Sequence, residues 1–218
     1  MKHMQSDKQT IAWFKIAECV SRGEKERALG VYRLLSHSFN DNAVALQLEA
    51  DIYLSFNEQE KAIALYHQAI KAYQKTDRLL EAVAICEHLL TITPSDFLLR
   101  KDVIRLFKTI GIVAKVVGHM RYLVKHYIHT NQWQEVKAII ADGEDFADPL
   151  GRVTIYQQMI FLLHRKGESE GISLWCLEKA IDDLLIADNE KHMQEFLGLI
   201  QALDDSLYGH AVEYLKKA

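Results

Sequence analysis

The sequence predicts an all-α fold in which about twelve antiparallel helices stack as repeats. Apolar residues recur at three- and four-residue spacing almost throughout the 218 residues, which indicates helix rather than strand. Only 2 prolines and 10 glycines interrupt this pattern, and no segment alternates apolar and polar residues long enough to suggest a sheet. Self-similarity at fixed intervals predicts that the helices form an array of repeats.

Stripes of apolar residues mark the individual helices in chain order. Leu46, Ala50 and Tyr53 share one face of a helix over 42–56, because residues three or four apart lie on one side of a helix. The same spacing predicts helices over 8–22, 24–37, 42–56, 58–75, 78–91, 96–109, 112–129, 132–142, 151–166, 168–187, 189–203 and 206–217.

The ends of these helices are marked by turn and breaker residues. Pro94 and Pro149 each lie just ahead of an expected helix, where the missing N–H of proline costs no hydrogen bond. Residues that tolerate a left-handed backbone lie at or beside the other ends, namely Gly23, Asn57, Asp77, Gly111, Asn131 and Gly167. The connections are short, so consecutive helices should pack antiparallel.

A recurring short sequence motif predicts the repeats. It has a small residue, an aliphatic residue and, four positions after the first, a bulkier apolar residue. Copies of the motif begin at Ala28, Ala62, Ala82 and Val116, at steps of 34, 20 and 34 residues, and a further step of 20 reaches Val136. Fixed periods on this scale are typical of stacked repeat arrays.

A longer period of 54 residues contains these steps. It lays residues 43–96 over 97–150, so that Tyr73 meets Tyr127. We interpret the period as a three-helix unit used at least twice. A third, degenerate copy begins at Gly151, with two or three extra residues near 167–171.

The fullest copy of the pattern lies in residues 43–76. Large, small, aromatic, turn, small, aromatic and small positions are occupied there by Leu46, Ala50, Tyr53, Asn57, Ala62, Tyr66 and Ala69. This order resembles the tetratricopeptide repeat, whose helix pair carries W-x2-L-G-x2-Y, then A-x3-F/Y, then P. Residues 9–42 also match, 77–142 hold worn copies, and 151–218 is helical but degenerate.

The resemblance implies a single helical-repeat domain over 1–218, wound as a right-handed α–α superhelix with a concave groove. From it we expect a scaffold, adaptor or chaperone that binds another protein or a peptide. A structural subunit that self-assembles through its terminal helices is the alternative, and an enzyme is the third hypothesis. Family members that hold the carboxyl terminus of chaperones use lysines and asparagines where Trp13, Ala17 and Leu48 stand here, so that mode is not expected.

Charge is unevenly distributed, although the formal net charge is only −4. Residues 100–130 hold seven Lys or Arg against Asp102 alone, whereas 131–205 hold fifteen acids and six bases. The basic residues form two helical stripes, one of Lys101, Arg105 and Lys108 and the other of Arg121, Lys125 and His129.

These stripes could line a groove for an acidic segment, or they could lie on a solvated outer face. The sequence leaves open whether helix 96–109 or helix 112–129 faces the groove. Nucleic acid is not expected as a partner, because the patch is short and the chain as a whole is acidic.

Aromatic and cysteine residues are mostly expected in the core. Phe14, Trp133 and Trp175 are interpreted as core residues, whereas Trp13 is a candidate for partner binding because its position faces the groove in the family. The cysteines are far apart and expected to be reduced and buried, at Cys19, Cys86 and Cys176.

No catalytic, cofactor or metal site is predicted. His126 and His129 are one helical turn apart, but no cysteine or carboxylate nearby in sequence completes a ligand set. Phosphate-binding and nucleophile motifs are absent, and the acidic stretches 142–145 and 168–170 are interpreted as solvated linkers. The polar N-terminus and the lack of a long apolar run predict a cytoplasmic protein that does not enter a membrane.

The last helix is expected to cap the array. Tyr208, Val212 and Leu215 form a narrow apolar stripe that should pack onto helix 189–203 and cover Phe196, Leu199 and Ile200.

Overall fold

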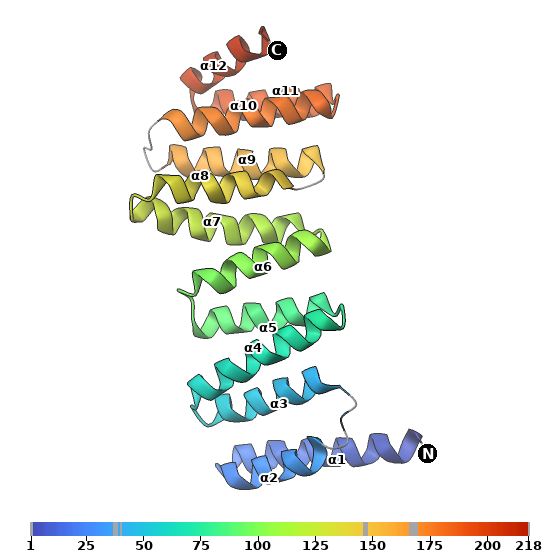
Figure 1. Ribbon diagram of the computed structural model, residues 1–218. Helices are drawn as coiled ribbons and strands as arrows, with labels where there is room; N and C mark the ends of the chain where they lie inside the picture. Colours follow the sequence, from blue (N-terminus) through green and yellow to red (C-terminus); the bar gives the residue numbers. More distant parts are fainter. Residues whose placement is uncertain (1, 37–38, 40, 146–147, 166–169, 218) are drawn as a thin grey trace. The chain divides into compact units, whose positions relative to one another are not determined.

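The computed structural model describes residues 2–36, 39, 41–145, 148–165 and 170–217, and within these residues it contains helices and turns but no strand (Figure 1). The helices are α1 Lys2–Ser21, α2 Lys25–Ser36, α3 Asn42–Ser55, α4 Gln59–Lys75, α5 Leu79–Ile92, α6 Phe97–Ile110, α7 Val113–His129, α8 Trp133–Ala141, the 3-10 helix η1 Asp142–Asp145, α9 Pro149–His164, α10 Glu170–Ile186, α11 Glu190–Leu203 and α12 Asp205–Leu215. The prediction of an all-α chain with about twelve helices is thus confirmed.

Two of the expectations about secondary structure were wrong. α1 begins at Lys2 rather than near residue 8, because no glycine or proline interrupts the polar residues that precede the apolar stripe. The acidic stretch 142–145, expected as a linker, is the 3-10 helix η1. Gly167 and most of the second acidic stretch, 168–170, lie outside the described residues.

The predicted turn residues adopt the left-handed backbone that ends a helix. All five that the structure describes have positive φ, from 53° to 83°: Gly23, Asn57, Asp77, Gly111 and Asn131. The chain then returns a hydrogen bond to the last turn, as where the Glu58 N–H donates to the Tyr53 carbonyl at 3.0 Å. Asp188, at φ 46°, is a further turn residue that the sequence did not single out.

The 54-residue period is visible in the local structure. α4 shifted by 54 residues gives the bounds of α7, and Gln132 N–H to Tyr127 repeats the bond of Arg78 N–H to Tyr73. The first residue of each copy of the motif is fully buried, with 0% of its surface exposed, at Ala28, Ala62, Ala82, Val116 and Val136. Small buried residues at these positions let neighbouring helices approach closely.

A third copy follows with three extra residues. α9 ends 54 residues after α6, but α10 and α11 begin 57 residues after α7 and α8. Asp188 likewise lies 57 residues after Asn131, which explains its left-handed backbone. The extra residues therefore fall between α9 and α10, where the sequence predicted two or three of them.

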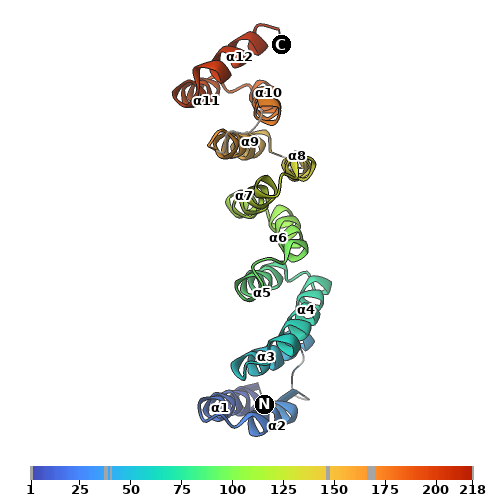
Figure 2. The same ribbon diagram turned by 90° about the vertical axis from the view of Figure 1, so that its left-hand side faces the viewer.

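The chain forms two compact units, Met1–Leu106 and Phe107–Ala218. In the first unit α1 packs on α2, α3 on α4 and α4 on α5, and a cluster of buried residues that includes Leu29, Tyr32 and Ile52 joins α1, α2 and α3. In the second unit α7 packs against both α8 and α9, and α9 packs against α10. Figure 2 shows α7, α9 and α11 along one side of this unit and α8 and α10 along the other.

The cysteines follow the expected burial, whereas Trp133 and Trp175, expected in the core, are only partly buried. Cys19, Cys86 and Cys176 are free and buried, as predicted. Phe14, expected in the core, is 72% exposed, because α1 packs on α2 only with the face that carries Ile16 and Cys19.

The last helix caps its unit with a different face from the one predicted. α12 packs on α10 as well as α11, and its buried residues are Leu207 and Ala211. Polar contacts fix this rotation, since His210 lies 2.9 Å from Glu178 and the Tyr214 hydroxyl donates to Asp182 at 3.0 Å. Phe196 and Ile200 are buried as expected, but Leu199 remains 43% exposed.

Among the helices in the described part of the chain, none has the length and apolar character needed to cross a membrane.

Candidate functional site

The second basic stripe of the sequence lies on the face of α7 that is directed toward α9. Arg121, Lys125 and His129 recur every four residues and so share one side of the helix. They line a hollow of about 670 Å³ together with residues from α9 and its end, namely Gln158, Phe161, Leu162 and Arg165. The three predicted residues are thus brought to one surface with a fourth basic residue that the sequence analysis missed.

A second hollow continues the first along the same two helices. It has a volume of about 570 Å³ and shares Arg121 and Gln158 with the first hollow. The remaining lining residues come from the first turns of both helices, namely Val113, Ala114, Val117, Gly118, Asp148, Leu150, Gly151 and Thr154. Since the two beginnings share one hollow and the two ends share the other, α7 and α9 run parallel. We call the two hollows together the α7–α9 groove, with a cationic half and an apolar half.

The cationic half lacks a compensating carboxylate among its described lining residues. α7 has 17 residues and α9 has 16, and neither contains aspartate or glutamate. The acid in the lining of the groove is Asp148, at the far end of the apolar half, where its carboxylate accepts a hydrogen bond from the Leu150 N–H at 3.1 Å. Arg121, Lys125 and Arg165 therefore concentrate positive charge on one surface, and a bound carboxylate would relieve their mutual repulsion.

Arg121 joins the two halves. Its Nη1 donates to Gln158 Oε1 across the groove at 3.3 Å, so one hydrogen bond links α7 to α9 between the hollows. Lys125, His129 and Arg165 are exposed, whereas Arg121 is half-buried. Arginine presents a planar fork of donors that matches a carboxylate, which suits Arg121 and Arg165 to hold an anionic side chain.

The first basic stripe has a different environment. Lys108 Nζ lies 3.2 Å from Asp142 Oδ1, and its side chain is only 14% exposed. Arg105 Nη2 forms an ion pair with Asp102 Oδ1 at 2.8 Å, one turn away on α6. These carboxylates offset the charge of the stripe, and none of Lys101, Arg105 and Lys108 is among the lining residues of the α7–α9 groove.

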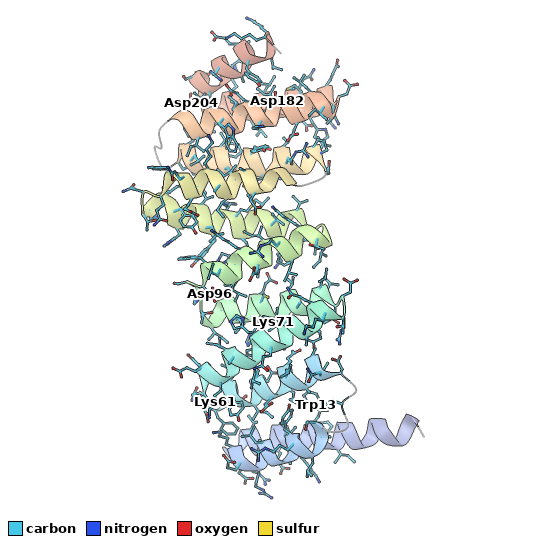
Figure 3. The ribbon with its side chains drawn as sticks, viewed as in Figure 1. Trp13, Lys61, Lys71, Asp96, Asp182 and Asp204 are labelled. Carbon is cyan, nitrogen blue, oxygen red and sulfur yellow. The ribbon has the colours of Figure 1, made fainter. Side chains whose placement is uncertain are left out.

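Trp13, the other candidate for partner binding, lies on α1 in the first unit (Figure 3). It is 43% exposed, and its neighbours Ile11 and Phe14 are 54% and 72% exposed. Three large apolar side chains of the first helix are thus exposed. The role of Trp13 in binding stays a prediction.

A smaller hollow in the first unit is polar but internally paired. It has a volume of about 320 Å³ and is lined by Asp51, Tyr66, Glu81 and His88, among others. The Tyr66 hydroxyl donates to the Asp51 carboxylate, and Glu81 accepts from Arg78 Nε at 2.8 Å. Burial raises the pKa of Asp51, and the hydrogen bond from Tyr66 lowers it in part. The Tyr66–Asp51 hydrogen bond joins α4 to α3, and an edge-on contact of Tyr66 with His88 joins α4 to α5, so we assign these residues to the framework of the unit.

The groups that could support catalysis or metal binding are dispersed or buried. Within the described residues, no three His, Cys, Asp or Glu side chains converge on a point that could hold a metal ion. His119 stacks on Phe107 with 5.7 Å between ring centroids, and His126 contacts Tyr127 edge-on at 5.5 Å. Burial raises the pKa of Cys86 to about 12, which keeps this thiol protonated and unreactive near neutral pH.

Comparisons with known proteins add no relative. No protein-family model matches the chain, and a search of curated proteins finds no match. The resemblance to the tetratricopeptide repeat therefore rests on the residues of this chain alone.

The sequence analysis missed one wall of the groove. Gln158, Phe161 and Arg165 carry no motif, and they came together with α7 only through packing. One signal could have pointed to them: residues 149–165 contain no carboxylate, although they lie within the acidic part of the chain.

Proposed function

We propose that this chain is a helical-repeat scaffold, similar to tetratricopeptide proteins, that binds an acidic segment of another protein in the α7–α9 groove. The three-helix period and the small residues buried at its helix contacts support a superhelical repeat array of this kind. The role of adaptor or chaperone rests on the resemblance, whereas the cytoplasmic location is expected from the polar N-terminus and the lack of a long apolar run.

One observation carries the proposal. The cationic half of the groove places Arg121, Lys125 and Arg165 on one hollowed surface whose described lining contains no carboxylate. Apolar side chains lie beside the charges, since Phe161 and Leu162 line the same hollow. A single exposed ion pair contributes only about 0.2–1 kcal/mol. Three or four pairs on one surface can therefore contribute about 1–3 kcal/mol, which also makes binding sensitive to salt.

Charge reversal in the groove tests the proposal. The probe is a fluorescein-labelled, glutamate-rich peptide of about eight residues, and the readout is its fluorescence anisotropy on titration with protein. The double variant Lys125→Glu/Arg165→Glu should weaken binding at least tenfold, because two attractive contacts become repulsive. Both side chains are exposed, so the helical circular dichroism should not change.

The repeat supplies a matched control. Lys71 and Lys75 on α4 lie 54 residues before Lys125 and His129, and both are exposed. Lys71→Glu/Lys75→Glu changes the net charge by the same amount and should leave the affinity within about twofold. Equal weakening by both double variants would mean that only the overall charge matters, and no weakening by the groove variant would overturn the proposal.

The alternative function, self-assembly through a terminal helix, is favoured by exposed apolar side chains on α1. Ile11, Trp13 and Phe14 are between 43% and 72% exposed. If these side chains join two copies, light scattering should show a dimer that Phe14→Ser converts to a monomer. A full-length chain that is monomeric at all concentrations would remove this alternative.

A further inference from the structure

The apolar half of the α7–α9 groove contains space that no side chain of its walls fills. A Cβ atom built on Gly118 would meet no heavy atom within 4 Å, although this glycine lies on α7 with an ordinary helical backbone. Gly151 on α9 lines the same hollow. Around these two glycines the walls include four aliphatic side chains, from Val113, Ala114, Val117 and Leu150, together with Thr154. This half of the groove therefore matches an apolar side chain rather than a charged one.

The groove is long enough for a ligand of several residues. Its two hollows follow a 17-residue helix, which is ~25 Å long at ~1.5 Å per residue. An extended segment of about seven or eight residues spans that length.

The distance between the two halves sets the spacing of the ligand. Gly118 is the last apolar lining residue that α7 contributes to this hollow, and Lys125 lies seven residues later in the cationic half. Seven residues of helix span ~10 Å, and an extended chain covers that distance in about three residues.

We propose that the groove recognises an extended segment of a partner protein in which an apolar residue precedes or follows a pair of acidic residues by about three positions. The apolar side chain occupies the space beside Gly118 and Gly151, and the acidic pair contacts Arg121, Lys125 and Arg165. This inference rests on the proposed function, since the acidic pair is the ligand assigned there to the cationic half.

Peptide series separate the two proposals. The first peptide carries a glutamate pair in a serine–glycine background, and the second adds leucine about three residues from the pair. The third places the leucine about seven residues away, as a helical ligand would need. Full-length protein should bind the second peptide about tenfold or more tightly than the first, because burying a leucine contributes on that scale. The third peptide should show no such gain.

A steric block identifies the place of the leucine. Gly118→Leu fills the apolar half from the wall of α7, so it should remove the advantage of the second peptide while leaving the affinity for the first unchanged. The control is Gly198→Leu on α11, another exposed helical glycine whose added Cβ meets nothing within 4 Å. That control should keep the full advantage. Both changes replace glycine with a better helix former, so neither should lower the melting temperature.

The outcomes distinguish the inference from the function on which it rests. If the first peptide binds and responds to charge reversal but leucine adds nothing, the bipartite ligand is wrong and the acidic ligand stands. An equal gain from the third peptide would overturn the extended register, and equal weakening of both peptides by Gly118→Leu would overturn the separate apolar half. If no peptide binds, both proposals fail.

Discussion

A buried ion pair between α9 and α10 offers a quantitative test of how the second unit is held together. Arg152 Nε lies 2.9 and 3.0 Å from the two carboxylate oxygens of Asp183, and Arg152 Nη2 also donates to this carboxylate. The side chains are only 17% and 9% exposed. The hydrogen bonds to Asp183 raise the pKa of Arg152, so the guanidinium remains charged under all practical conditions.

Removing one partner should cost far more than removing both. Arg152→Met leaves the Asp183 carboxylate buried without its counter-ion, and breaking a buried pair in this way typically costs about 3–5 kcal/mol. Asp183→Leu leaves the arginine, which is slightly more exposed, and should cost about 3 kcal/mol. The double variant replaces the pair with apolar side chains and should lie within about 1 kcal/mol of the parent protein.

Urea unfolding followed by tryptophan fluorescence measures these differences. Trp133 and Trp175 belong to the second unit. The Trp175 ring contacts the Tyr156 ring edge-on, with 6.1 Å between centroids, and Tyr156 lies on α9, the helix that carries Arg152. The coupling free energy from the four proteins isolates the pair from the effects of each side chain alone. A single variant as stable as the parent, or a double variant that loses as much as both singles together, would refute the reasoning.

Two further predictions concern the core of the first unit. Ala62→Leu should lower the free energy of unfolding by about 1–3 kcal/mol, because Ala62 has no exposed surface and the added atoms must displace neighbouring side chains. Ala64 is exposed on the same helix, so Ala64→Leu is the control, and equal thermal midpoints for the two variants would contradict this packing. Cys86 should resist alkylation at pH 8, because burial raises its pKa to about 12, and it should react at the rate of unfolding when urea is added. Mass spectrometry locates the alkylated cysteine, and rapid alkylation of Cys86 in the folded chain would contradict this prediction.

The positions of the helices could be predicted because they depend on local interactions. Gly23, Asn57 and Gly111 end helices through their own backbone conformation, and Pro149 begins one through its fixed φ. The burial of Ala62 and Val116 was predictable for a related reason, since a period repeated along the chain places equivalent residues in equivalent contacts. The sequence by itself therefore determined the fold class, the bounds of most helices and the three-helix period.

The tertiary structure decided which charges share a surface. The two basic stripes have the same helical spacing, yet Lys108 lies against Asp142 while Arg121 and Lys125 line a groove with Arg165. Asp142 and Arg165 each lie more than thirty residues along the chain from the stripe residues that they accompany, and no local pattern specifies these neighbours. The rotation of α12 was decided in the same way, because Glu178 and Asp182 on α10 hold it by side-chain contacts that the apolar stripe of α12 does not encode.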